Sequence, residues 1–100
     1  KKGRATRLKE LATERRTFII YESPIRLLKT LQELATNCGI DREASVSREI
    51  SKIHDTTHRG TLDELIQYFS KNQAKGEIVI VVSGYKEEDA EKIHKNKYKQ

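Results

Sequence analysis

The stretch from Gly76 to Gly84, GEIVIVVSG, decides the fold of this 100-residue chain. Its central residues, 78–82, are all apolar and β-branched, which is typical of a strand in the middle of a sheet with both faces covered. A glycine precedes this run and a Ser-Gly pair ends it, as expected at the ends of a strand. The stretch therefore predicts a central strand around which the other elements pack.

Two further segments predict neighbouring strands. Residues 17–21, TFIIY, have the β-branched and aromatic composition of a buried strand. Residues 43–50 alternate between polar and apolar side chains, which predicts a strand with one covered face. Arg48 falls on the apolar face. Because an unpaired buried charge is costly, this arginine must form an ion pair, point into a cavity or leave the sheet at its edge.

Three segments predict helices. Apolar residues recur at helical spacing in residues 6–15, which indicates a short amphipathic helix. The Ser-Pro pair at 23–24 can begin a second helix, and Gly39 can close it because glycine readily adopts a positive φ. Residues 61–64, TLDE, fit a capping box that begins a third helix, and its apolar pattern continues to Phe69.

The order helix, strand, helix, strand, helix, strand predicts an α/β (α+β) fold, a small mixed β-sheet with helices packed on it. Residues 1–5 are basic and contain a glycine, so we expect a flexible linker from a preceding N-terminal domain. Residues 6–84 are expected to form the domain. Residues 85–100 place acidic before basic side chains and are expected to be a charged tail, either a frayed helix or disordered.

Composition narrows the class of protein. The chain holds 20 basic and 15 acidic residues, a net charge of +5 that favours a polyanionic partner, although charge runs at both ends can also be solvated tails. Cys38 is the only cysteine and is expected to pack beneath the end of the second helix, so no internal disulfide or cysteine-based zinc site can form. No apolar stretch is long enough to span a bilayer, and we expect a soluble, cytoplasmic protein. Since the chain contains no methionine, we expect it to be a segment of a longer protein.

Few residues suggest chemistry by themselves. The glycines are isolated, so no phosphate-binding loop is present. His54 and His58 have a spacing that could bind a metal on a helix, but residues 52–60 are interpreted as a surface loop and no metal is expected. No serine is combined with a histidine in the manner of a catalytic triad. With two Phe and four Tyr, base stacking is expected to be minor.

The segment Tyr21-Glu22-Ser23 lies where a strand passes into a helix, the part of an α/β sheet where ligands usually bind. Glu22 could contact a ligand there. It could equally be a carboxylate that stabilises the start of the helix through the helix dipole. The residues leave both interpretations open.

Four segments, read together, resemble the ribosomal RNA small subunit methyltransferase I family of the tetrapyrrole methylase superfamily. The resemblance runs from about Lys2 to Gly84 and matches the C-terminal domain of that family. Ile25 departs from the family pattern, which usually has histidine after Ser-Pro, and the glycine-rich cofactor loop of the family has no counterpart because it lies in the N-terminal domain. The four segments are YESPIRL at 21–27, SREISK at 47–52, RGTL at 59–62 and GEIV at 76–79.

The resemblance implies an enzyme that is dimeric when whole and incomplete as a catalyst in this fragment. It would transfer a methyl group from S-adenosylmethionine to the ribose 2′-hydroxyl of a cytidine in small-subunit ribosomal RNA. The cofactor would lie between two domains, and the C-terminal one would contribute the ends of its first two strands and the start of its last. The resemblance identifies no catalytic base. The cofactor-binding residues that it implies are Tyr21, Glu22, Arg48, Glu49, Ile50, Gly76 and Glu77.

Two alternatives remain open. The chain could be a lobe of a methyltransferase for a tetrapyrrole or another small molecule. It could also be an RNA-docking module whose basic residues contact phosphates, a role compatible with the enzyme. For Arg48, an internal salt bridge with Glu49 or Glu22 competes with a ligand contact. The basic residues of the docking hypothesis are Lys1, Lys2, Arg4, Arg7 and Arg26.

Overall fold

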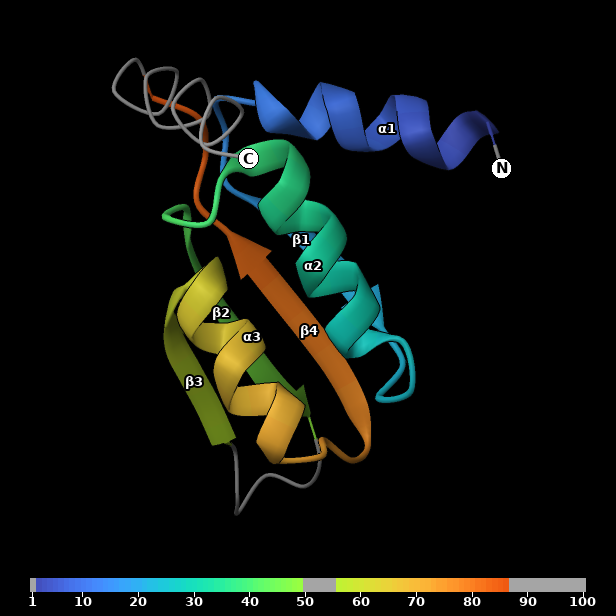
Figure 1. Cartoon of the computed structure of the whole chain (residues 1–100), viewed down its shortest axis with the longest axis vertical. Coiled ribbons are helices and arrows are strands. Elements are labelled where there is room, and N and C mark those ends of the chain that lie inside the picture. The colour runs from blue at the N-terminus through green and yellow to red at the C-terminus, as the bar shows by residue number, and fades with distance from the viewer. Residues whose placement is uncertain (1, 50–55, 87–100) are drawn as a thin grey trace.

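The structure, a computed structural model, describes residues 2–49 and 56–86 of the chain. It confirms the α+β class, with a small sheet and helices packed on it (Figure 1). The elements in chain order are α1 (Lys2–Ala12), β1 (Phe18–Glu22), α2 (Leu27–Cys38), β2 (Glu43–Glu49), β3 (Thr56–Thr61), α3 (Leu62–Lys71) and β4 (Glu77–Val82).

The four strands form one sheet in the order β1-β4-β2-β3, and all three pairings are antiparallel. β4 therefore lies between β1 and β2, as the apolar run at 78–82 predicts. β1 and β3 lie at the edges of the described sheet (Figure 1). Because β4 runs opposite to both of its neighbours, its first residues lie beside the last residues of β1 and β2.

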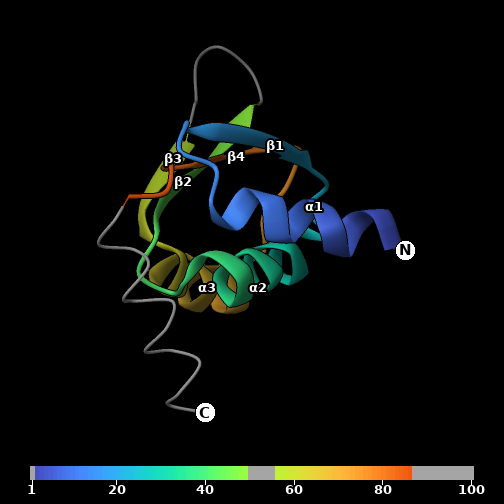
Figure 2. The same cartoon turned by 90° about the horizontal axis from the view of Figure 1, so that it is seen from above.

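All three described helices lie on the same side of the sheet, with α2 and α3 side by side and α1 next to α2 (Figure 2). The covered face of the sheet meets the apolar faces of α2 and α3, and this contact is the core. Cys38 is buried there, as predicted. The most deeply buried apolar residues are Leu27, Leu31, Leu34, Leu62, Val46, Ile78, Ile80 and Val82.

The opposite face of the sheet carries no helix within residues 2–49 and 56–86. Ile19 and Tyr21 of β1 point to this face and are 57% and 75% exposed, while Val79 and Val81 of β4 are half-buried. The predictions of a fully buried β1 and of a β4 covered on both faces are therefore wrong for the described chain. Continuous apolar runs do not distinguish a strand covered on both faces from one that keeps an apolar but open outer face.

Three helix boundaries differ from the prediction. α1 begins at Lys2, so most of the segment expected to be a linker is helical, and it ends at Ala12 instead of continuing to residue 15. α2 begins at Leu27 because the three residues after Ser23 form a turn, in which the backbone N–H of Arg26 donates to the Ser23 hydroxyl at 3.4 Å. Its end is as predicted, since Gly39 follows it with a φ of 102°.

Strand β3 was not predicted, because residues 52–60 read as a surface loop. Its polar sequence, TTHRGT, suits an edge strand that pairs only with β2 and leaves one face open to water. The predicted capping box is confirmed directly after it. The N–H of Glu64 donates to the Thr61 hydroxyl at 3.1 Å, and the N–H of Thr61 donates to the Glu64 carboxylate at 2.8 Å.

The predicted tail lies mostly outside the described residues, which end at Lys86. At its start, the N–H of Tyr85 donates to the Glu14 carbonyl at 2.6 Å, and the Arg15 guanidinium lies 5.8 Å from the Tyr85 ring centroid. These contacts join the segment after β4 to the segment between α1 and β1. Among the helices that the structure describes, none combines the length and the apolar character needed to cross a membrane.

Candidate functional site

Three of the segments named by the family resemblance meet at one end of the sheet. In the antiparallel register, Ile78 of β4 lies between Glu22 of β1 and Arg48 of β2, and Glu77 lies opposite Glu49. Gly76 directly precedes this row with a φ of 78°, a conformation that favours glycine. The ends of β1 and β2 and the start of β4 are therefore neighbours in space, although up to 56 residues separate them in sequence.

The residues at this end of the sheet are divided between its two faces. Ile78 is buried, so its register partners Glu22 and Arg48 also point to the inner face. Tyr21 pairs with Val79 and points to the outer face, where it is 75% exposed. Of the other residues that the resemblance implies, the Glu49 side chain and Ile50 lie outside the described part of the structure.

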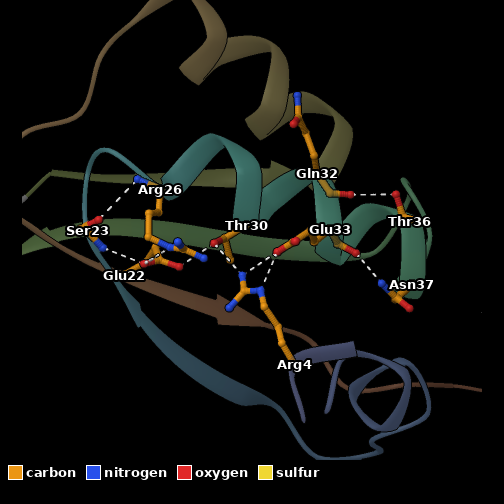
Figure 3. Close-up of polar contacts among 9 residues, drawn as sticks. All are labelled: Arg4, Glu22, Ser23, Arg26, Thr30, Gln32, Glu33, Thr36 and Asn37. Atoms are coloured by element: carbon orange, nitrogen blue, oxygen red, sulfur yellow. Dashed lines mark hydrogen bonds and ion pairs between the residues drawn. The ribbon is translucent and has the colours of Figure 1, made fainter. Parts of the chain in front are cut away.

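The Glu22 carboxylate is the centre of a hydrogen-bond network at the start of α2 (Figure 3). One oxygen accepts from the Ser23 N–H at 3.0 Å, and the other accepts from the buried Thr30 hydroxyl at 2.5 Å. The Arg26 guanidinium lies 3.7 Å from the first oxygen. These contacts connect the end of β1 to the turn before α2 and to the first turn of that helix.

The same network holds α1 against α2. Arg4 of α1 donates to the Glu33 carboxylate at 2.5 and 3.1 Å and to the Thr30 hydroxyl at 3.3 Å (Figure 3). This hydrogen bond lowers the pKa of Glu33 and raises the pKa of Arg4. Arg4, a predicted RNA contact, thus has an internal partner, while its side chain is still 40% exposed.

This ion pair makes part of the stability of the chain depend on pH. Because the pKa of Glu33 lies below its ordinary value of 4.5 in the folded chain, its contribution is present above that pH and is lost as the pH falls through the folded-state pKa. We expect Glu33→Gln to lower the free energy of unfolding at pH 7 by at most about 1 kcal/mol, since a partly exposed pair is screened by water. Arg4→Gln should have a similar effect.

A double-mutant cycle of these two substitutions isolates the interaction energy between Arg4 and Glu33, and it is measured by urea unfolding at pH 7 and again near pH 2. The cycle is needed because the hydrogen bond from Arg16 also lowers the pKa of Glu14, to about 2. The expected coupling energy between Arg4 and Glu33 is favourable at pH 7 and absent in acid. Equal coupling at both pH values would contradict the assignment.

The other described basic residues of the RNA-docking hypothesis lie near Arg4. Arg7 is exposed on α1 and lines a hollow of about 470 Å³ together with Arg4 and Glu22. Arg26 lies in the turn before α2 beside Glu22. Lys1 and the side chain of Lys2 lie outside the described part of the structure.

Arg48 points into a small pocket between the sheet and the C-terminal end of α3. The pocket has a volume of about 140 Å³, and the Arg48 Nε is buried there without a hydrogen-bond partner among the described residues. No ion pair between Arg48 and Glu22 is present among the described residues, and the Glu49 side chain, the other predicted partner, lies outside them. Arg48 lines a cavity, which is one of the outcomes predicted for it. The lining residues are Val46, Arg48, His58, Tyr68, Phe69, Asn72, Gln73, Ala74 and Ile78.

Three rings form a cluster at this pocket. The His58 ring of β3 lies 4.3 Å from the Tyr68 ring of α3 and 5.5 Å from the Phe69 ring, and Tyr68 and Phe69 meet edge to face at 4.9 Å. The sequence analysis missed this cluster because it depends on β3, which was not predicted. No group of three potential metal ligands occurs in residues 2–49 and 56–86, and His54 lies outside them.

A more open hollow lies elsewhere on the described chain. It has a volume of about 540 Å³ and is lined by residues such as Glu43, Arg59, Thr61 and Ser83. These belong to the start of β2, the end of β3 and the residue after β4, at the opposite end of the sheet from Arg48. Of the four segments named by the family resemblance, only RGTL at 59–62 contributes to its lining.

Comparison with known proteins gives close relatives but no matching family model. The chain is 48% identical over 82 residues to the ribosomal RNA small subunit methyltransferase I of Synechocystis sp.. The matched segment covers 82% of the chain and 29% of that relative. It is 42% identical over 83 residues to the protein of the same name from Thermotoga maritima, covering 83% and 37%. For Xylella fastidiosa the identity is 45% over 93 residues, covering 91% and 34%. The chain thus spans 29 to 37% of the length of these relatives.

Proposed function

Because this chain belongs to the ribosomal RNA small subunit methyltransferase I family, we propose that it is the C-terminal lobe of an enzyme that methylates small-subunit ribosomal RNA. The observation that carries the proposal is the 48% identity over 82 residues to a relative of that name. From the family resemblance, we further propose that the methyl donor is S-adenosylmethionine and that the acceptor is a cytidine ribose 2′-hydroxyl. We also propose a cytoplasmic homodimer for the whole protein.

In this proposal, the ends of β1 and β2 and the start of β4 form one wall of the cofactor pocket. Two features of the described chain are compatible with that role. Tyr21 offers an exposed ring, which suits stacking against an aromatic group or contact with a cation. Gly76 has a positive φ at the start of β4, where no side chain shields the backbone amide and carbonyl. The proposed wall consists of Tyr21, Glu22, Glu49, Ile50, Gly76 and Glu77, and the Arg48 side chain is considered separately below.

We propose that the lobe holds the cofactor in position and supplies no catalytic base. S-adenosylmethionine supplies an electrophilic methyl group bound to a sulfonium. The acceptor hydroxyl would have to lie in line with the methyl carbon–sulfur bond and give up its proton to a base. The carbon–oxygen bond forms as the carbon–sulfur bond breaks, and the leaving group is the neutral thioether S-adenosylhomocysteine. The Glu22 carboxylate is held by Ser23 and Thr30, so we assign it to the stability of the wall rather than to proton abstraction. We propose that the base and the opposite wall belong to the remaining length of the protein.

Calorimetric titration of S-adenosylmethionine tests this division of the site. We expect no binding to the 100-residue chain and micromolar to millimolar binding to a longer protein that also carries the rest of the relatives' length. Tyr21→Ala in the longer protein should lower the affinity for S-adenosylmethionine. Ile25→Ala, at a 90% exposed position in the turn before α2, serves as the control. Tight binding to the chain alone would place the cofactor pocket within this lobe and would contradict the shared site.

A further inference from the structure

The pocket that holds Arg48 has the composition of a nucleic-acid subsite. We propose that it binds one phosphate of a single-stranded RNA segment through Arg48, while the Tyr68 ring stacks against a neighbouring base. This inference rests on the proposed function, because it assigns the RNA substrate to a specific place on the lobe. It lies on the inner face of the sheet beneath α3, and Tyr21 of the proposed cofactor wall points to the outer face.

The size of the pocket favours a single small group. Pockets for whole cofactors or drug-sized ligands have volumes of roughly 300 to 1,000 Å³. The pocket at Arg48 has about 140 Å³, which is too small for a complete nucleotide or for S-adenosylmethionine. One phosphate group can enter it while the rest of the ligand lies outside on the surface of α3.

Arg48 supplies the donor that a phosphate needs. Its Nε is buried and has no hydrogen-bond partner among the described residues, a costly arrangement that an anionic ligand would relieve. A guanidinium presents its N–H groups as a planar fork that matches two oxygens of a phosphate. The register places the Arg48 side chain on the same inner face of the sheet as buried Ile78, where it lines the pocket.

The surroundings of the pocket suit an anion. The described residues that line it include the amide side chains of Asn72 and Gln73 and no carboxylate. Lys71 at the end of α3 and Lys75 in the following loop are exposed on either side of these amides in the sequence. Basic and amide side chains are the usual partners of nucleic-acid phosphates.

Tyr68 supplies the aromatic surface. Its side chain is 40% exposed, yet its ring is held by His58 at 4.3 Å and by the edge contact with Phe69 at 4.9 Å. An exposed ring in a fixed orientation can stack with a base of any type. An arginine beside such a ring is the combination found in proteins that bind single-stranded nucleic acids.

Fluorescence anisotropy with the 100-residue chain and a labelled single-stranded RNA of about ten nucleotides tests the subsite, since single-strand sites span roughly 4 to 16 nucleotides. We expect Arg48→Gln and Tyr68→Leu each to weaken binding about tenfold. Arg48→Gln should also reduce the slope of log affinity against log salt concentration by about 0.7. Arg59→Gln is the matched control. It removes the same charge from exposed β3, on the open face of the same sheet, and should change the affinity less than threefold.

Thermal unfolding of each variant confirms that it is folded, and if Arg48→Gln does not fold, Tyr68→Leu at its partly exposed position decides the question. Equal weakening by Arg59→Gln and Arg48→Gln would show diffuse charge attraction and overturn the subsite. So would RNA binding that neither Arg48→Gln nor Tyr68→Leu changes, or no RNA binding by the chain at all.

The two proposals fail separately. A longer protein that methylates ribosomal RNA while Arg48→Gln and Tyr68→Leu leave its RNA affinity unchanged would refute the subsite and retain the proposed function. A longer protein that binds no S-adenosylmethionine, together with tenfold weaker RNA binding by both variants, would retain the subsite and refute the methyltransferase.

Discussion

Leu31→Ala is expected to lower the free energy of unfolding by about 3 to 5 kcal/mol. Leu31 lies in the middle of α2 and is fully buried between the helices and the sheet. The substitution removes apolar contacts and leaves a cavity that α2 cannot close, because Leu27 and Leu34, buried about one turn before and one turn after, hold the helix in place. Since the whole free energy of unfolding of a small domain is only about 5 to 15 kcal/mol, the variant should be close to unfolding at 37 °C.

Urea unfolding followed by circular dichroism measures this loss. Ile25→Ala is the control, because Ile25 is 90% exposed in the turn before α2 and its truncation should cost less than about 0.5 kcal/mol. A loss of less than about 1 kcal/mol for Leu31→Ala would mean that Leu31 is not part of the core.

Gly84→Ala is expected to lower the free energy of unfolding by about 1 to 3 kcal/mol. A Cβ at this position would collide with the backbone carbonyl of Arg15, and since the nearest atoms all belong to the backbone of Arg15 and Arg16, no flexible side chain can move aside. The close approach joins the segment after β4 to the segment before β1, where the Tyr85 N–H donates to the Glu14 carbonyl. The substitution should therefore separate two segments that are distant in sequence.

Gly3→Ala provides a matched control for this prediction. A Cβ at Gly3 would meet nothing within 4 Å, and alanine within α1 should stabilise the helix by about 0.5 to 1 kcal/mol. The midpoints of thermal unfolding should therefore shift in opposite directions for the two variants. A Gly84→Ala protein as stable as the unchanged chain would contradict the close contact between these segments.

The sequence predicts best the elements whose signals are local. The capping box at Thr61 and Glu64 and the glycine that ends α2 are confirmed, because a few adjacent residues determine each of them. The central position of β4 follows from its continuous apolar run. These signals do not require knowledge of the rest of the fold.

The errors concern features that depend on distant neighbours. The polar segment Thr56–Thr61 becomes a strand only because β2 offers it an edge, and periodicity cannot show that. Ile19 and Tyr21 were expected to be buried, but burial depends on which face the helices cover. The start of α1 was misplaced because the basic residues before Thr6 contain a glycine, which alone does not prevent helix formation.

In the candidate site, too, local signals were predicted from the sequence and contacts between distant segments were not. Alternation of side chains identified Arg48 as a charge on the apolar face, and the structure places it in a pocket. The stacking of His58 on Tyr68 could not be predicted, because it needs both the unpredicted β3 and the packing of α3 against it. The family resemblance named three strand ends, and the antiparallel register explains why they are neighbours.

Methyl transfer tests the central claim most directly. A longer protein that carries this lobe and the rest of the relatives' length is incubated with small ribosomal subunits and S-adenosylmethionine labelled in its methyl group. The account predicts label in the small-subunit RNA, recovered after nuclease digestion as 2′-O-methylcytidine, and no label when the 100-residue chain is used alone. Absence of label from the RNA, or label in a tetrapyrrole or another small molecule instead, would contradict it.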